Sequence, residues 1–221
     1  MTYTRCVSMT RQRGTPASPF TPLQWSCGVL ARVEPIPESA AAPIKVLHLA
    51  RAQAVWQRRG PLLRVAWLLL ETLILNNRLV TCSGVRVALL RAFGARIGQR
   101  CRLLQPLRVK SPWLLEMGND CWLGESVWIC NQDRVSIGSN VCLSQGVFLT
   151  TGSHDVRATM DLQVSPIVIE DGAWISAMCV VQRGITVGRS AVVTPLSVVH
   201  KSLAPGGIYG GNPCRFVRSR F

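Results

Sequence analysis

The sequence is poor in acidic residues and aromatic residues, and each shortage narrows the class of protein. Only 11 of its 221 residues are Asp or Glu, against 25 Lys or Arg, so the net charge is +14. This balance suits an anionic partner, such as a phosphate-rich cofactor, an anionic polysaccharide or an acidic membrane surface. Aromatic residues make up 6% of the chain. The arginines form no compact stripe and no zinc-finger or RNA-binding motif, so we expect no nucleic-acid partner.

The cysteines and the N-terminus also lack familiar patterns. None of the nine cysteines stands in a CxxC pair, and Cys101, Cys121 and Cys179 fall at one repeated position. We interpret these three as small buried residues in a reducing cytosol and not as a disulfide framework. The first 22 residues contain no apolar core of a secretory signal. We therefore expect a cytoplasmic protein.

The N-terminal part divides by composition. Residues 1–45 are rich in Pro, Ser, Thr and Ala and predict a loose tail. Residues 46–94 read as helical, with an apolar stretch over 62–75. This stretch is shorter than the ~20 residues of a membrane span, and Arg64 and Glu71 interrupt it.

Two interpretations of the 62–75 helix stay open. It packs on the body of the protein or on a neighbouring subunit, or it rests on the inner membrane surface as a peripheral contact. The second interpretation draws on nearby cations, which are Arg51, Arg58, Arg59 and Arg78. A further short helix over Val85–Phe93 is expected to end at Gly94.

Aliphatic residues recur every six positions from residue 97 onward. Two-residue slips separate the first three runs, and a longer break precedes the last. The positions are Ile97, Leu103, Val109, Leu115; Met117, Leu123, Ile129, Val135; Ile137, Leu143, Leu149; and Ile169, Ile175, Val181, Val187, Val193, Val199. Glycine often follows the aliphatic residue, and a small or apolar residue stands four positions after it.

A period of six fits neither an ordinary strand nor a helix. It predicts a mainly β, parallel solenoid, in which three hexapeptides form one triangular coil of about 18 residues. The aliphatic residues point inward, and small residues occupy the tight corners. Residues 95–202 then give about five coils. The helical region covers one open end, and residues 203–221 close the other or pack along a face.

The repeat is suspended over residues 150–168, and a regular solenoid has no packing reason for that excursion. Loops on a rigid scaffold often carry sites. His154 opens this loop and is the only histidine inside the repeat region, because His48 precedes it and His200 lies near its end.

Several motifs together resemble the hexapeptide-repeat acyltransferases, most nearly the colanic-acid-biosynthesis-type acetyltransferases. The similarity covers roughly residues 62–220. It rests on the hexapeptide repeat and on Leu89–Gly98, Pro112–Leu115, Leu143–Gln145, Thr151–Asp155, Gly172–Ile175 and Gly211–Pro213. The resemblance implies a left-handed β-helix and a homotrimer with sites between subunits. It also implies acetyl transfer from acetyl-CoA to a sugar hydroxyl of an exopolysaccharide or glycan precursor.

An imidazole is suited to remove the proton of a hydroxyl that attacks a thioester, so we predict His154 as the general base. Its other ring nitrogen needs an acceptor. The resemblance implies a carboxylate at the place of Asp161, as in related galactoside- and maltose-type enzymes. Asp161 is favoured over Asp155, because the side chains of neighbouring residues such as His154 and Asp155 rarely face each other. No cysteine lies in the loop, which favours direct attack over a cysteine-bound intermediate.

The resemblance also implies donor and acceptor contacts. Ala177 matches a small residue beside the pantetheine arm, and Pro195 replaces a residue whose N–H would bind CoA. The full predicted set for CoA is Trp174, Ala177, Pro195, His200, Lys201, Arg215 and Arg218. Asn131 is a candidate contact for the acceptor.

The repeat is also compatible with functions other than sugar acetylation. A γ-type carbonic anhydrase needs three metal-binding histidines, and only His154 is suitably placed, so we expect no metal. A serine acetyltransferase would carry a large helical N-terminal domain. A non-catalytic scaffold or retired enzyme is the alternative from another class, and the Thr194–Pro195–Leu196 departure favours it mildly.

Overall fold

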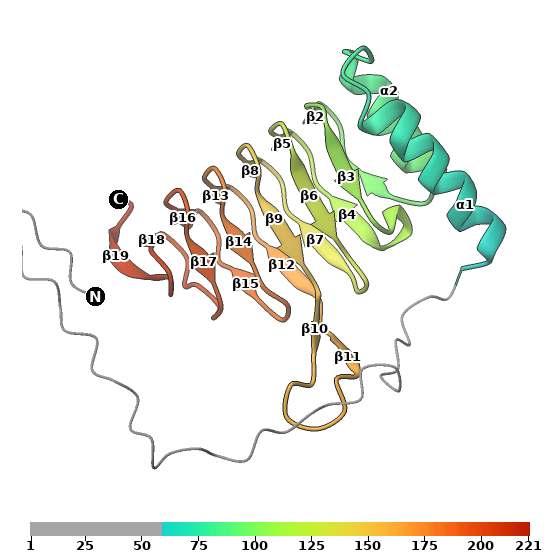
Figure 1. Ribbon diagram of the computed structural model, residues 1–221. Coiled ribbons are helices and arrows are strands. Elements are labelled where there is room, and N and C mark those ends of the chain that lie inside the picture. Colours follow the sequence, from blue (N-terminus) through green and yellow to red (C-terminus); the bar gives the residue numbers. More distant parts are fainter. Residues whose placement is uncertain (1–58) are drawn as a thin grey trace, which may run out of the picture. The chain divides into compact units, whose positions relative to one another are not determined.

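The computed structural model describes residues 59–221, and these form a three-sided parallel β-solenoid with helices at one end (Figure 1). The predicted tail 1–45 and the first part of the helical region lie outside the described residues. The mainly β solenoid is confirmed, and it is a left-handed β-helix. It has five complete coils and the start of a sixth, where Leu203 bridges to Val187.

Each side of the solenoid is one sheet. Sheet A holds β1 (Arg96–Ile97), β4 (Leu115–Met117), β7 (Val135–Ile137), β12 (Ile167–Ile169) and β15 (Thr186–Val187). Sheet B holds β2 (Arg102–Leu103), β5 (Trp122–Leu123), β8 (Cys142–Leu143), β13 (Trp174–Ile175), β16 (Val192–Val193) and β18 (Gly207–Gly210). Sheet C holds β3 (Leu107–Val109), β6 (Val127–Cys130), β9 (Phe148–Thr150), β14 (Val180–Val181) and β17 (Val198–Val199).

The interior is built from the six-spaced aliphatic residues. Every position of the predicted series from Ile97 to Val199 is buried. Equivalent residues stack in register along the axis, so Leu103 pairs with Leu123 and Leu123 with Leu143. The prediction that these side chains point inward is therefore confirmed, and their stacking supplies the apolar burial that stabilises the coils.

Glycines after the aliphatic residues allow adjacent coils to approach closely at the corner between sheets A and B. A Cβ added to Gly98 would lie 2.5 Å from the carbonyl carbon of Gly118. Side chains join the coils at this corner, since Asn119 Oδ1 accepts the N–H of Gln99 at 2.8 Å. Cys121 is buried there, and its thiol donates to the carbonyl of Gly138 at 3.0 Å.

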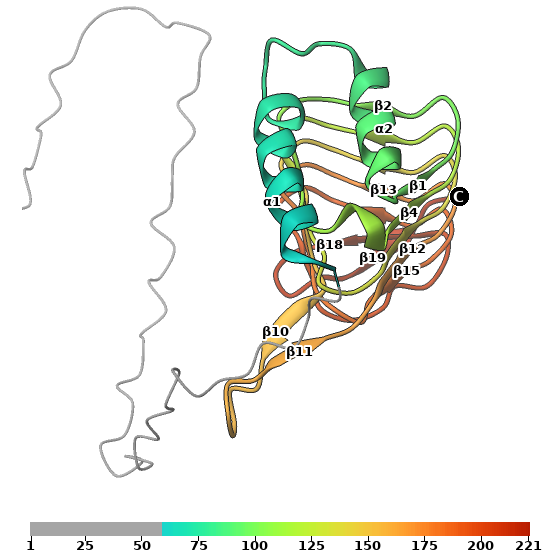
Figure 2. The same ribbon diagram turned by 90° about the vertical axis from the view of Figure 1, so that its right-hand side faces the viewer.

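Two helices precede the solenoid. Helix α2 (Ser83–Ala92) lies across the open end of the coils, as Figure 2 shows, and Gly94 with φ +93° follows it. Helix α1 (Pro61–Leu70) continues into a π-helical turn, η3 (Glu71–Leu75). The indole N–H of Trp67 donates to the carbonyl of Val109 at 2.8 Å, which fixes α1 beside sheet C.

The inner side of α1 thus packs on the body, as one of the two interpretations predicted. Within residues 59–221 no helix is long and apolar enough to cross a bilayer. At the other end, β19 (Arg215–Ser219) pairs antiparallel with β18 and closes the edge of sheet B. Arg220 adds hydrogen bonds to the carbonyls of Gly172 and Ser190.

Candidate active site

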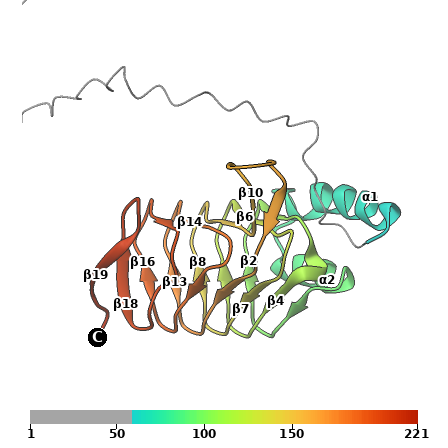
Figure 3. The same cartoon turned by 90° about the horizontal axis from the view of Figure 1, so that it is seen from below.

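The break in the repeat forms a β-hairpin that projects from the solenoid (Figure 3). Strand β10 (Gly152–His154) pairs antiparallel with β11 (Leu162–Val164), and His154 lies opposite Leu162. The sequence predicted only a loop here. The backbone groups of the excursion instead satisfy one another across two strands, which gives the projecting segment a defined shape.

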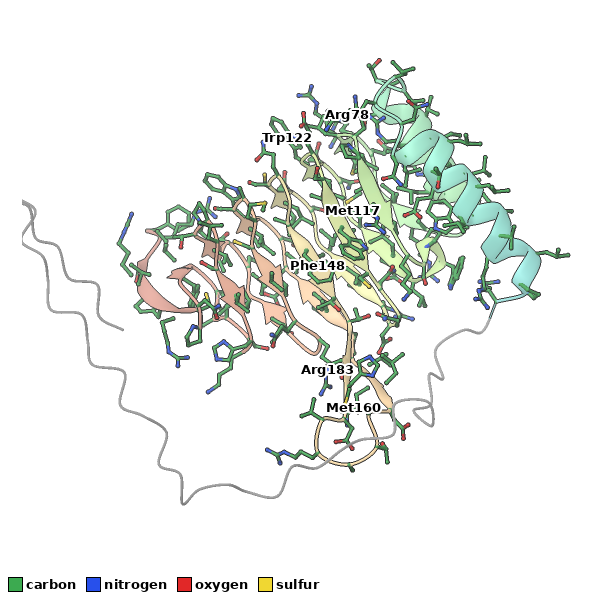
Figure 4. All side chains as sticks on the ribbon, viewed as in Figure 1. Arg78, Met117, Trp122, Phe148, Met160 and Arg183 are labelled. Atoms are coloured by element: carbon green, nitrogen blue, oxygen red, sulfur yellow. The ribbon has the colours of Figure 1, made fainter. Side chains whose placement is uncertain are left out.

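The hairpin is tied to the coils at both strands. Thr151 is fully buried, and its hydroxyl oxygen accepts the N–H groups of Gln132 and Asp133 at 2.8 and 3.0 Å. Arg183, from the next coil, donates to Gln163 Oε1 at 2.8 Å and lies beside the base of the hairpin in Figure 4. These contacts hold the hairpin at a fixed place along the solenoid.

His154 carries the chemistry that the site offers. Its Nδ1 atom lies 2.8 Å from the carbonyl oxygen of Met160. A carbonyl oxygen only accepts, so Nδ1 carries the proton and the neutral ring keeps its lone pair on Nε2. The side chain is exposed in the single chain. An accessible Nε2 lone pair is what a general base requires.

Neither Asp161 nor Asp155 is the observed partner of Nδ1. The Asp155 carboxylate instead accepts the N–H groups of Arg157 and Ala158 at 2.9 and 3.1 Å. The Asp155 N–H donates to the Asp161 carbonyl at 3.0 Å, and Met160 adopts φ +61°. The turn formed by these contacts presents the Met160 carbonyl to the histidine, and a role for the Asp161 or Asp155 carboxylate stays a prediction.

Four cysteines within or against the coils are poorly suited to act as nucleophiles. Burial raises the pKa of Cys121 to about 11 and also raises the pKa of Cys142, Cys179 and Cys214. Thiols in such surroundings carry almost no thiolate at neutral pH. With no cysteine in the hairpin, the arrangement favours direct attack on a donor.

The predicted donor residues gather around the C-terminal half of sheet C. Ala177 and Pro195 occupy the corner between sheets B and C in successive coils, where the N–H of Leu196 donates to the Ala177 carbonyl at 3.0 Å. Trp174 is half exposed on β13, and its indole N–H donates to Ser144 Oγ at 2.9 Å. On the other side of this corner, the outward residues of the C-terminal strands of sheet C are aliphatic, Val180 and Val198.

The predicted cations gather near the end of the solenoid. His200 and Lys201 follow β17, and Arg215 and Arg218 lie on β19. The Nη1 atom of Arg215 is 3.5 Å from Nε2 of His200. Nδ1 of His200 is buried without a hydrogen-bond partner. Lys201, Arg215 and Arg218 are exposed, as groups that meet phosphates must be.

Asn131 does not face the site in the described chain. It is fully buried, its Oδ1 accepts the N–H of Ser111 at 2.9 Å, and its amide donates to the Ser111 carbonyl at 2.7 Å. These bonds occupy the amide and join two coils. Asn131 therefore serves the stacking of the coils and has no exposed amide to offer an acceptor.

Sequence reasoning missed a groove beside the hairpin. It has a volume of about 460 Å³ and runs between α1 and sheet C. Its lining combines Trp67, Trp113 and Trp128 with Arg64, Arg108 and Lys110. The Arg108 guanidinium lies 4.3 Å from the ring centre of Trp128, which contacts Phe148 at 4.7 Å. Trp128 alternates with the buried Val127 and Ile129, and that alternation was the available signal for an outward tryptophan.

The groove ends one coil from the hairpin. Its last residue, Cys130 on β6, is in register with Thr150 on β9, immediately before the hairpin. A second depression of about 640 Å³ lies over sheet A. Ion pairs occupy its charges, including Arg96 with Glu116 at 3.3 Å. Among residues 59–221 no group of three His, Cys, Asp or Glu side chains could hold a metal ion.

Two bacterial proteins are similar in sequence, although no family model matches the chain. WcaF of Escherichia coli K12, named as an acetyltransferase of colanic acid biosynthesis, is 35% identical over 61% of this chain and 75% of its own length. The galactoside O-acetyltransferase of the same organism is 27% identical over 60% of this chain and 68% of its own length.

Two solved structures are similar in fold. A hexapeptide-repeat acetyltransferase of Vibrio cholerae, in complex with acetyl coenzyme A, gives a TM-score of 0.67 at 26% identity. The match covers 72% of this chain and 88% of that one. A galactoside acetyltransferase in complex with coenzyme A also gives 0.67, at 22% identity over 73% of this chain and 82% of its own. The second likeness concerns the fold alone.

Proposed function

Because this chain belongs to the hexapeptide-repeat acetyltransferases and is an acyltransferase, we propose that it transfers an acetyl group from acetyl-CoA to a sugar hydroxyl. The acceptor is a sugar of an exopolysaccharide or glycan precursor. The names of the relatives in colanic acid biosynthesis and galactoside acetylation support this class. The donor is supported by the acetyl coenzyme A complex of the Vibrio cholerae protein.

The observation that carries the proposal is the position of His154 on the hairpin, which hydrogen bonds join to the coils. Nε2 of His154 removes the proton as the acceptor oxygen forms a bond to the thioester carbonyl carbon. The carbon–sulfur bond then breaks, and the proton passes from Nε2 to the sulfur of CoA. The Nδ1–H bond to the Met160 carbonyl, at 2.8 Å, holds the ring and stabilises the imidazolium between the two transfers.

The donor is placed along the C-terminal half of sheet C. The pantetheine arm needs an apolar slot, which Ala177, Val180 and Val198 offer beside Trp174. The phosphates need cations, which Lys201, Arg215 and Arg218 offer near the last coil. With the donor in this position, its thioester points toward the hairpin. The hairpin projects from the solenoid between the N-terminal and C-terminal halves of sheet C. Pro195 contributes its ring to the slot and no N–H.

The acceptor is placed on the other side of the hairpin, in the groove beneath α1. The exposed face of an aromatic ring suits the apolar face of a sugar ring, and Trp128 lines this groove. Arg64, Arg108 and Lys110 add positive charge, which favours an acceptor with a carboxylate or phosphate. His154 then lies between donor and acceptor along one face of the solenoid.

We also propose a homotrimer in which the hairpin of one subunit reaches a neighbour. The His154 side chain is exposed in the single chain, and an acyl transfer that excludes water needs a second surface over it. The supply of acetyl-CoA supports a cytoplasmic location.

The test is release of CoA from acetyl-CoA over a panel of neutral and acidic sugars and nucleotide sugars. The wild-type chain is expected to turn over at least one acceptor. His154→Ala should reduce kcat/KM by about 10² to 10⁴ and still bind acetyl-CoA in calorimetry. Binding without turnover of any sugar would favour another small acceptor, such as serine. An unchanged rate in His154→Ala, with no acetyl-CoA binding by the wild type, would favour a scaffold.

A further inference from the structure

The outer side of α1 and η3 is an apolar surface that no other part of residues 59–221 covers. Three of its side chains, Leu62, Leu69 and Leu73, are more than half exposed, with Leu62 at 85%. Val65 and Leu68 are also more than half exposed, and they border the groove on the side of the helix. Leu79, in the segment after η3, is 88% exposed. So many large aliphatic side chains gathered on one helix mark an interaction surface.

The fold does not need these leucines. The opposite side of the same helix already packs on the body through Trp67 and Leu75, which are buried. Trp67 also makes its hydrogen bond to Val109 and contacts Phe93 at 5.1 Å between ring centres. The inner side therefore accounts for the position of α1, and the outer side is available to a partner.

The charges around this surface are of one sign. Between residues 59 and 95 the only acidic residue is Glu71, and its carboxylate is turned inward, where it accepts the N–H of Val109 at 2.8 Å. Arg59, Arg64 and Arg78 are exposed. An apolar helix face with cations and without anions complements the headgroups of acidic lipids.

We propose that the outer side of α1 and η3 binds the surface of an anionic membrane. The helix lies in the plane of the interface, with Leu62, Leu69 and Leu73 among the acyl chains and Arg59 and Arg78 at the headgroups. The 15 residues of α1 and η3 are too few to span the ~30 Å core of a bilayer, which fits a helix that lies on it.

The test is sedimentation of the full chain with vesicles. Vesicles of phosphatidylcholine with phosphatidylglycerol should bind the wild type, and pure phosphatidylcholine should bind it weakly. The double variant Leu69→Glu, Leu73→Glu should weaken binding by more than about tenfold. Arg59→Ala and Arg78→Ala should each weaken it about fivefold, and salt at about 1 M should weaken binding of the wild type.

Val217→Glu is the matched control. It places the same charge at an apolar side chain that is 59% exposed on β19, at the other end of the solenoid (Figure 1). This variant should bind vesicles like the wild type. The melting temperature of each variant establishes that the chain is folded.

Three outcomes would overturn the proposal. The wild type does not bind anionic vesicles, or it binds neutral vesicles equally well. Alternatively, Leu69→Glu, Leu73→Glu lowers the oligomeric mass in light scattering without lipid, while the wild type does not bind vesicles. The last result would assign the surface to a second copy of the chain.

Discussion

Nδ1 of His154 and the carbonyl oxygen of Met160 lie 2.8 Å apart, across the turn of the projecting hairpin. The contact fixes the ring through a backbone group, and it depends on the φ of +61° at Met160. Because the carbonyl makes the contact, the chemical nature of the Met160 side chain should matter less than the conformation that the residue can adopt.

A pair of substitutions at Met160 tests this dependence. Asn tolerates a positive φ, so Met160→Asn should keep kcat within about twofold of the wild type. Val is strained there and should shift the carbonyl, so Met160→Val should lower kcat by about tenfold or more. Steady-state CoA release measures both, and acetyl-CoA binding should be equal in the two variants. Equal kcat values for Met160→Asn and Met160→Val would mean that the position of the Met160 carbonyl does not matter for catalysis.

The repeat could be read from sequence because the solenoid imposes one requirement on every coil. An inward residue such as Leu123 stacks between Leu103 and Leu143, so each must be aliphatic at the same interval. Gly98 follows from the same geometry, since the next coil leaves no space for a Cβ. Because the same packing requirement recurs in every coil, it produces a repeated pattern of residue types that can be recognised in the sequence.

The details of the site depend on contacts that residue types do not record. The observed partner of His154 Nδ1 is a backbone carbonyl, and because every residue has one, no residue type in the sequence indicates this contact. The groove forms because Trp67 of α1 donates a hydrogen bond to the carbonyl of Val109, 42 positions away, and this bond holds α1 beside sheet C. Asn131 looked available as a polar residue, but Ser111 of the preceding coil occupies its amide.

Phosphate recognition can be separated from acyl transfer by shortening the donor. Lys201→Ala and Arg218→Ala should each raise KM for acetyl-CoA by about tenfold, because each removes a charge-assisted contact to phosphate. With S-acetyl-pantetheine, which lacks the phosphates, the same variants should match the wild type. Arg134→Ala, an exposed arginine near Glu116 on sheet A, is the control. Equal losses with both donors would place these cations outside the phosphate site.

The acceptor groove can be tested with two tryptophans in similar settings. Arg108 lies over Trp128 on sheet C, and Arg102 lies over Trp122 on sheet B at 5.2 Å. Trp128→Ala should raise KM for the acceptor about five- to tenfold through lost stacking, with KM for acetyl-CoA unchanged. Trp122→Ala should change neither constant. If only Trp122→Ala raised KM for the acceptor, the acceptor would bind on sheet B and not in the groove.

Two glycines should respond oppositely to alanine. At Gly98 the added Cβ would meet the backbone of Gly118, so Gly98→Ala should lower the free energy of unfolding by about 1 to 3 kcal/mol. At Gly84, in α2, the nearest atom is Cys82 Sγ at 3.7 Å. Gly84→Ala should raise stability by up to roughly 1 kcal/mol, because alanine is the better helix former. Urea unfolding measures both changes, and destabilisation of similar size at both positions would refute the close approach between coils.

The buried carboxyl of Glu71 should make stability depend on pH. Burial raises the pKa of Glu71 above its usual 4.5, although the Val109 N–H and Arg108 act in the opposite direction. The folded chain therefore binds this proton more tightly than the unfolded chain. Stability falls as pH rises from about 4.5 through the raised pKa and is then constant for this group.

Glu71→Gln keeps an oxygen that can accept the Val109 N–H and removes the ionisation. The stability of the variant relative to the wild type should therefore be greater at pH 7 than at pH 4, as measured by urea unfolding at a series of pH values. A difference between Glu71→Gln and the wild type that is the same at every pH would mean that the Glu71 carboxyl titrates alike in the folded and unfolded chains.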